Sequence, residues 1–148
     1  MNAHRLPFQF DEDLNAFKLF MLDVGLMGAM AETSAESMLV GDNVFSEDKG
    51  AFTVLFVFTQ LKSRHFSLYY QAVESSTIEI DFLTQWHDRV IPIEVKAEVN
   101  VKAKSLHTFI NNNPELQGLR FSMLPYKKQD WVINVPLYAC LVPFDYYR

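Results

Sequence analysis

Thr77-Ile-Glu-Ile-Asp81-Phe82 and Val90-Ile-Pro-Ile-Glu94-Val95-Lys96 are the two segments that decide the fold of this chain. In each segment apolar residues alternate with other residues, which is the pattern of a β-strand with one buried face. The intervening Thr84-Gln-Trp-His-Asp-Arg89 is polar and short, so it predicts a hairpin loop and antiparallel pairing of the two strands. The same alternation predicts that Asp81 and Glu94 lie off the apolar faces, close to each other.

Asp81, Glu94 and Lys96 together have the chemistry of a magnesium-dependent phosphodiesterase site. Glu94 and Lys96 are two positions apart on one strand and therefore share a face. Two carboxylates, with a backbone carbonyl and waters, suit a hard cation such as Mg²⁺. A neighbouring lysine can neutralise a phosphate or steady the attacking water. The other interpretation of these residues is the solvent-exposed face of an ordinary hairpin in an acidic protein.

The composition indicates one acidic domain with ample material for a core. The chain has 148 residues, 49% of them hydrophobic, and a formal net charge of −5, so one domain is expected and any nucleic-acid contact should be local. The single Cys140 excludes an internal disulfide and is expected to be a core thiol. No segment has the length and hydrophobicity of a membrane span or signal peptide, so a soluble, cytoplasmic protein is expected.

The rest of the pattern predicts strands and helices mixed around one sheet. Further strands are expected at Phe17–Leu22, Phe66–Tyr70, Arg120–Leu124 and Trp131–Ala139, the last with an edge position or bulge at Pro136. Helices are expected from Val24, capped by Asp23, from Ser34 to Gly41, and at Gly50–Ser63 and Lys102–Asn112.

Other motifs carry little chemistry. The four histidines form no i, i+4 pair and no H-E-x-x-H, and the sequence contains neither G-x-S-x-G nor G-x-x-x-x-G-K-[ST], so it has no phosphate-cradling loop. Lys127-Lys128, beside Tyr126 and Trp131, fits either a contact with a nucleic-acid backbone and base or a solvated turn.

A set of ordered segments forms a second pattern that runs from about Phe17 to Tyr138. The segments are Lys18–Leu26, Lys49–Ala51, Glu74–Thr77, Glu79–Phe82, Ile91–Ala97, Lys102–Leu106, Asp130-Trp131 and Asn134–Tyr138. Together they resemble the C-terminal domain of unknown function that follows an AAA-type ATPase module in many bacterial and archaeal proteins. That domain is similar in fold to the PD-(D/E)XK, or restriction-endonuclease-like, superfamily. The resemblance implies an α/β core whose mixed central sheet is flanked by helices.

By this resemblance Asp81 and Glu94 are ligands of a magnesium ion and Lys96 is the catalytic lysine. Glu79, Ser105 and Gln60 are implied as auxiliary positions at most. The chain departs from the family where Val54 replaces a helix glutamate and Gln60 replaces a second one that is often present. Valine removes a negative acceptor from beside the proposed ion, so a second metal is not expected.

The family also normally begins with a nucleotide-binding module, and no P-loop precedes the resemblance here. Residues 1–148 are therefore expected to be one detached nuclease-like domain that does not hydrolyse ATP. The expected function is a nuclease-like domain with lost or weakened catalysis, acting as an interaction module for an AAA-type ATPase or a nucleic acid. A working magnesium-dependent nuclease and a folded remnant without its own function are the alternatives. The sequence specifies neither DNA nor RNA, nor the oligomeric state.

Overall fold

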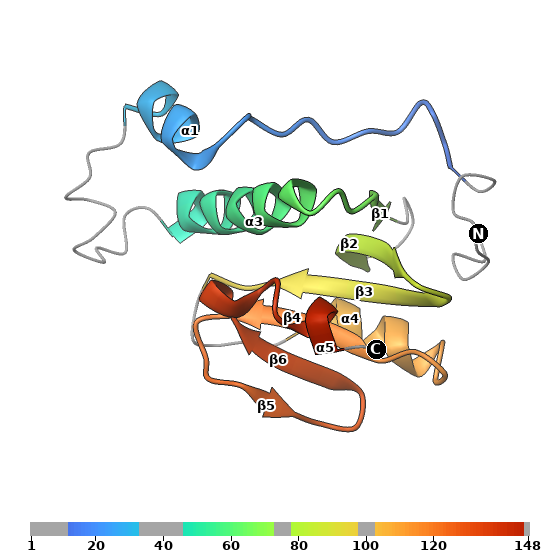
Figure 1. Ribbon diagram of the computed structural model, residues 1–148. Coiled ribbons are helices and arrows are strands. Elements are labelled where there is room, and N and C mark those ends of the chain that lie inside the picture. The colour runs from blue at the N-terminus through green and yellow to red at the C-terminus, as the bar shows by residue number, and fades with distance from the viewer. Residues whose placement is uncertain (1–11, 33–45, 73–77, 98–102, 147–148) are drawn as a thin grey trace.

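The computed structural model describes residues 12–32, 46–72, 78–97 and 103–146, which form an α/β fold around a mixed six-stranded sheet (Figure 1). The strands are β1 (Leu68–Ala72), β2 (Glu79–Trp86), β3 (Arg89–Val95), β4 (Gly118–Ser122), β5 (Lys127–Lys128) and β6 (Val132–Pro136). The helices are α1 (Val24–Met30), α3 (Ser46–Ser63), α4 (Lys104–Asn111), α5 (Pro143–Tyr146) and the 3₁₀ helix η3 (Leu137–Ala139). The mixed sheet flanked by helices confirms the α/β prediction.

The strands stand in the order β1-β2-β3-β4-β6-β5. The neighbours β1 and β2, β2 and β3, and β5 and β6 pair antiparallel, whereas β3 with β4 and β4 with β6 pair parallel. The helix α4 makes the crossover between the parallel strands β3 and β4, and it lies behind the sheet in the view of Figure 1. The ends of β3, β4 and β6 therefore point to the same side of the molecule.

The predicted hairpin is confirmed as an antiparallel pair of β2 and β3, but its loop is much shorter than predicted. Pairing runs from Phe82 opposite Ile93 to Trp86 opposite Arg89, so only His87 and Asp88 turn the chain. His87 has a φ of 54°, the left-handed conformation that a tight turn requires. The polar Thr84 belongs to the strand because its buried hydroxyl donates to the carbonyl of Ser67 at 2.9 Å.

Two apolar clusters cover the two faces of the sheet. The cluster under α3 contains Val57, Leu61, Phe82, Ile91, Ile93, Val95, Leu119, Phe121, Val135, Cys140 and Phe144, among others. The cluster under α4 contains Ile80, Leu83, Val90, Leu106, Phe109, Ile110 and Val132. Along β3 Ile93 and Val95 therefore face α3, and Glu94 between them faces the α4 side.

In the N-terminal segment the predicted helix cap at Asp23 is confirmed, and the predicted strand at Phe17–Leu22 is wrong. Asp23 caps α1, because its Oδ1 accepts the N–H of Leu26 at 2.8 Å. The strand predicted at Phe17–Leu22 does not form, and the segment runs past α3 (Figure 1) and contacts β2 through Lys18 with Glu79 and Phe20 with Phe82. Its anchor is Phe20, whose ring stacks on Phe58 of α3 at 4.0 Å. Phe20 is thus held by aromatic contacts, whereas Phe17, Leu19 and Leu22 are 70%, 88% and 82% exposed, so the apolar pattern here did not indicate a buried strand face.

The other elements differ from the predictions mainly at their ends. The helix α3 begins at Ser46 rather than Gly50, α4 at Lys104 rather than Lys102, and β1 at Leu68 rather than Phe66. The β-branched Thr53 is accommodated in α3 because its hydroxyl donates to the carbonyl of Lys49 at 2.7 Å. The helix predicted from Ser34 to Gly41 lies outside the described residues.

The C-terminal third corrects three predictions. The strand β6 ends at Pro136, and η3 replaces its predicted continuation, so the proline ends an internal strand and marks neither an edge nor a bulge. Lys127 and Lys128 form the short edge strand β5 rather than a turn. Trp131 packs against the α4-side cluster, and its ring meets His107 at 4.7 Å, so it is not displayed for stacking on a base. The element α5 was not predicted.

Cys140 is the core thiol that the sequence predicts. It lies 2% exposed in the α3-side cluster. Burial raises the pKa of its thiol to about 11, so the thiolate that a nucleophile needs is disfavoured at neutral pH.

Candidate functional site

A β-bulge stands where the candidate site begins. In the pairing of β1 with β2, Tyr69 faces Leu83 and Gln71 faces Ile80, so the single residue Tyr70 stands opposite both Asp81 and Phe82. Bulges interrupt a ladder and re-aim side chains, and they are frequent beside active sites. Here the bulge sends Ile80 and Phe82 into clusters on opposite faces of the sheet. The regular alternation predicted for this strand is therefore wrong at Asp81.

Asp81 is fixed between the two strands of the hairpin. Its Oδ2 accepts the backbone N–H of Val95 at 2.7 Å, just beyond the last regular pair of Phe82 with Ile93. Burial raises the pKa of this carboxyl above its ordinary value, while the Val95 hydrogen bond and the charges of Lys96 and Lys18 act against that rise. The side chain thus takes the place of a ladder hydrogen bond and ties the two halves of the site together.

Glu94 is a buried acid, only 4% exposed. Its Oε1 lies 2.6 Å from the Nζ of Lys96, and its Oε2 is buried without a hydrogen-bond partner among the described residues. Burial raises the pKa of Glu94, the negative charge of Asp81 adds to that rise, and Lys96 opposes it. The solvent-exposed hairpin face that the sequence also allowed does not describe this residue.

Lys96 stands at the border between the site and the solvent. Its backbone N–H donates to the carbonyl of Phe121 at 2.9 Å, so β4 fixes its position directly after β3. Its side chain is 34% exposed, whereas that of Glu94 is 6% exposed. The lysine therefore pairs with the buried acid while part of its side chain stays in contact with solvent.

A second ion pair forms the outer rim of the site. Glu79 pairs with Lys18, which comes from the N-terminal segment, and the Lys18 Nζ also lies 4.7 Å from the centre of the Tyr70 ring. The negative charge of Glu79 disfavours ionisation of both Asp81 and Glu94. Glu79, an auxiliary position in the sequence analysis, thus acts through its charge, and the contribution of Lys18 was missed.

A buried polar cluster continues the site along the sheet and was also missed. In the parallel strands, Glu94 stands beside Arg120, and Arg120 beside Asn134. The Nε of Arg120 and the hydroxyl of Ser122 both donate to the Oδ1 of Asn134, at 2.9 and 2.7 Å. The sequence signal was polar residues alternating with buried apolar ones in two strands, at Leu119–Ser122 and Val132–Val135.

The remaining sequence candidates lie on the helices. Gln60 and Val54 are half-buried on α3, and Val54 packs against the apolar cluster on the face opposite Glu94. Ser105 is half-buried in the first turn of α4. The central three residues of the site, Asp81, Glu94 and Lys96, therefore come from the β2–β3 hairpin and its immediate continuation alone.

The donor set of the site suits one hydrated hard cation. Within the described part of the chain no group of three or more His, Cys, Asp or Glu side chains is arranged to hold a metal. Asp81 and Glu94 offer two carboxylates, one of which has a buried oxygen that lacks a hydrogen-bond donor. Mg²⁺ keeps several waters and binds through one or two carboxylates, so the residues present fit it.

The fold and the site define an α/β domain with one half-buried and one buried carboxylate at the open end of a central hairpin. The family model described as Domain of unknown function (DUF4143) matches residues 49–139, more than half of the chain, so the protein belongs to this family. The matched residues include Asp81, Glu94 and Lys96. No curated protein and no solved structure matches the chain. Among the described helices, none has the length and apolar character needed to cross a membrane.

Proposed function

We propose that the protein is a restriction-endonuclease-like domain of the PD-(D/E)XK type, with weakened or lost catalysis, that binds other molecules. In this proposal Asp81 and Glu94 hold one Mg²⁺ beside Lys96, and a phosphodiester of a nucleic acid is the ligand. The observation that carries the proposal is the buried Glu94, paired with Lys96 through one oxygen and left without a hydrogen bond on the other. An AAA-type ATPase is the protein partner that the sequence resemblance implies.

The order of elements supports the proposed fold. The chain runs α3, β1, β2, β3, α4 and β4, and the acids lie on the central antiparallel pair β2 and β3. This arrangement agrees with the α/β core, carrying an aspartate and an E-x-K strand, that the resemblance implies. The bulge at Asp81 adds a local feature that is common beside active sites.

Each residue of the site has a definable role. A bound Mg²⁺ would polarise a phosphoryl oxygen and activate a water. Asp81, held by the Val95 N–H, and Glu94, held by Lys96, would orient the carboxylates toward it. Lys96 would place its positive charge beside the phosphate, because its partly exposed side chain is the cation of the trio that reaches solvent.

Two features support weakened catalysis. The helix acid that the resemblance implies is Val54 here, so that acid is missing from the set, although Val54 packs on the sheet face opposite Glu94 and not beside the proposed ion as the sequence led us to expect. The pKa values of Asp81 and Glu94 are both raised by burial, so protons compete with a cation for these carboxylates more strongly than at ordinary carboxyl groups. Binding with slow or absent hydrolysis is the behaviour that this combination favours.

The proposal is tested with labelled single- and double-stranded DNA and RNA oligonucleotides. Fluorescence anisotropy should show binding that requires Mg²⁺ or Mn²⁺, and gels should show cleavage no faster than for Asp81→Asn. Lys96→Met should weaken binding, and Arg89→Met, which removes an exposed cation at the turn end of the hairpin, is the control. Absence of binding to every oligonucleotide, together with no retention of an AAA-type ATPase, would leave a folded remnant and contradict the proposal.

A working magnesium-dependent nuclease is the second candidate. The observation in its favour is that Lys96 pairs with Glu94 on the hairpin that also carries Asp81, so the aspartate and the E-x-K strand of the nuclease set are all present. The same gels decide between the two candidates. Cleavage that requires Mg²⁺ and is abolished in both Asp81→Asn and Lys96→Met would establish the nuclease.

A further inference from the structure

Three buried polar residues form a row on the α4 side of the sheet. Glu94 of β3, Arg120 of β4 and Asn134 of β6 are direct register partners and are 4%, 7% and 1% exposed. Neighbouring strands lie about 4.8 Å apart, so the side chains of Glu94 and Arg120 leave the sheet from adjacent positions on two neighbouring strands. An ionisable side chain this deeply buried normally has a charged partner.

The orientation of Arg120 is fixed by a hydrogen-bonded clamp. Asn134 accepts from Arg120 and Ser122 through Oδ1, and its Nδ2 donates to the carbonyls of Leu124 and Pro125 at 3.1 and 2.9 Å. The amide flip of Asn134 is thereby determined, because its two carbonyl acceptors require the NH₂ group. The clamp holds the guanidinium of Arg120 through its Nε on the β6 side of β4, and Glu94 is the register partner of Arg120 on the other side.

The charges of the site balance only if Arg120 is counted. Asp81 and Glu94 contribute two negative charges, and Lys96 contributes one positive charge that is partly screened by solvent. We propose that Arg120 is the charge-compensating residue of the acidic site, and that its positive charge beside Glu94 limits how tightly the site binds a divalent cation. The second half of this inference rests on the proposed function, whereas the first half does not.

The hydrogen bond to Asn134 does not by itself require an arginine at position 120. Asn134 needs only a neutral donor where Arg120 stands, since Ser122 already supplies one of the same kind. Burial acts against the charged form of Arg120 and lowers the pKa of its guanidinium, and the charge of Glu94 acts in the opposite direction. Glu94 therefore stabilises the charged arginine at this position, and Arg120 stabilises the charged glutamate in return.

A double-mutant cycle at pH 8 tests the charge coupling without any metal. Melting temperatures are compared for the full chain, Glu94→Gln, Arg120→Gln and the double variant, because glutamine keeps a donor for Asn134 and removes only the charge. Glu94→Gln should raise the melting temperature more in the Arg120→Gln background than in the wild type. Equal changes in the two backgrounds would overturn the inference.

Arg120→Lys keeps the positive charge and is the second variant to measure, in case Arg120→Gln does not fold. In its background the effect of Glu94→Gln should return to the wild-type value, and an effect as large as that in Arg120→Gln would overturn the inference. Lys128→Met, on the exposed strand β5, is the control that should not couple to Glu94.

Calorimetric measurement of Mn²⁺ binding tests the second half of the inference, that Arg120 limits the affinity of the site for a divalent cation. Arg120→Gln should tighten binding several-fold and Arg120→Lys should leave it unchanged, because only the former leaves the site more negative. Weaker binding in both variants would show that Arg120 only maintains the structure and would overturn the inference. If the wild-type chain binds no Mn²⁺, the proposed cation site fails, and the thermal cycle alone decides whether Arg120 compensates Glu94.

Discussion

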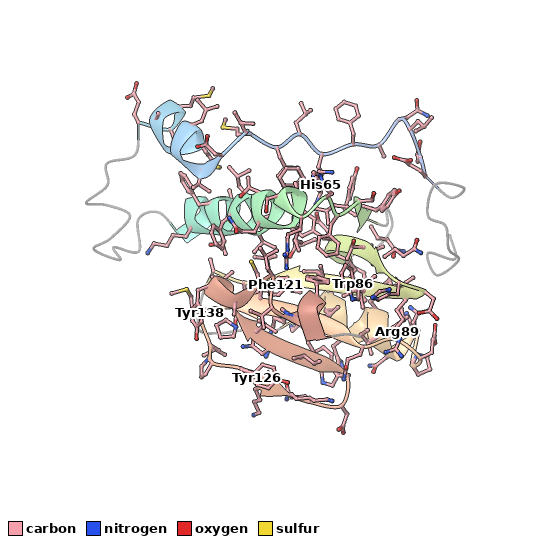
Figure 2. All side chains as sticks on the ribbon, viewed as in Figure 1. His65, Trp86, Arg89, Phe121, Tyr126 and Tyr138 are labelled. Carbon is pink, nitrogen blue, oxygen red and sulfur yellow. The ribbon has the colours of Figure 1, made fainter. Side chains whose placement is uncertain are left out.

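The two ends of the β2–β3 hairpin are built from opposite kinds of interaction. At the turn, the rings of Phe66, Trp86 and Phe144 lie 4.5 to 5.6 Å apart in a mutual aromatic cluster, with Trp86 near the middle of the molecule in Figure 2. At the other end lie two acids with raised pKa values, the half-buried Asp81 and the buried Glu94. The same two strands thus stabilise the fold at one end and work against it at the other.

The contrast separates stability from function. Trp86 also has a buried Nε1 without a hydrogen-bond partner among the described residues, but that group is neutral, whereas the unpartnered oxygen at the open end belongs to an acid. Burying an acid oxygen without a hydrogen bond costs more than burying a neutral donor without one. Aromatic residues at the periphery do not stabilise the fold as the cluster at the turn does. Tyr126 and Tyr138 lie at the edge of the molecule (Figure 2) and are 62% and 89% exposed. The acidic end is therefore where a ligand-binding role is expected.

The largest effect is expected at the turn end, from Phe66→Ala. Phe66 is 6% exposed and contacts both Trp86 and Phe144, so its removal should lower the free energy of unfolding by about 3–5 kcal/mol. Urea unfolding measures this loss, and Leu14→Ala, at a position 82% exposed, is the control that should change little. A loss as small as that of the control would show that the aromatic cluster at the turn does not stabilise the fold.

A smaller loss is expected at the acidic end from Lys96→Met. The variant leaves Glu94 buried without its cation, and because Lys96 is 34% exposed the loss should be about 1–2 kcal/mol, less than for a fully buried pair. Adding Glu94→Gln to Lys96→Met should recover most of this loss in the same urea experiment. No recovery in the double variant would mean that Lys96 stabilises the fold through contacts other than Glu94.

Glu94→Gln alone should change the free energy of unfolding in the opposite direction. It should stabilise the protein at pH 8 by up to about 1 kcal/mol. The folded-state pKa of Glu94 is raised, so its negative charge lowers stability at high pH, and this cost disappears as the pH falls from the raised pKa to below the ordinary value of 4.5. The stability difference between variant and wild type should narrow over that range. A constant difference from pH 8 to pH 4 would show that the charge is not the cause.

The smallest effect is expected at the outer rim, from Lys18→Met. The side chains of Lys18 and Glu79 are 32% and 54% exposed, and ion pairs with this much solvent contact contribute little, so the change in unfolding free energy should stay within about 0.5 kcal/mol. A loss equal to that of Lys96→Met would erase the distinction between the buried trio and its rim.

Local patterns in the sequence predicted several features of the fold and of the candidate site. Strand alternation identified the hairpin, the two-residue spacing placed Glu94 and Lys96 on one face, and the Asp23 cap fixed the start of α1. Each of these depends on neighbours within one or two strands or a single helical turn, where side-chain periodicity is a direct signal.

Contacts between distant parts of the chain were not predictable in the same way. The bulge at Asp81 is visible only from its pairing opposite Tyr70. Lys18 reaches Glu79 across 61 positions, and Arg120 meets Glu94 only through the parallel register of β3 and β4. The short turn was missed because the buried Thr84 looks polar in the sequence but satisfies its hydroxyl on a backbone carbonyl.

The central claim is that Asp81 and Glu94 together bind one divalent cation, and a calorimetric titration of the full chain with Mn²⁺ at pH 8 tests it most directly. The account predicts one ion per chain, with binding lost in Asp81→Asn and in Glu94→Gln and retained in Lys18→Met. An absence of binding, or binding that survives both carboxylate substitutions, would contradict it.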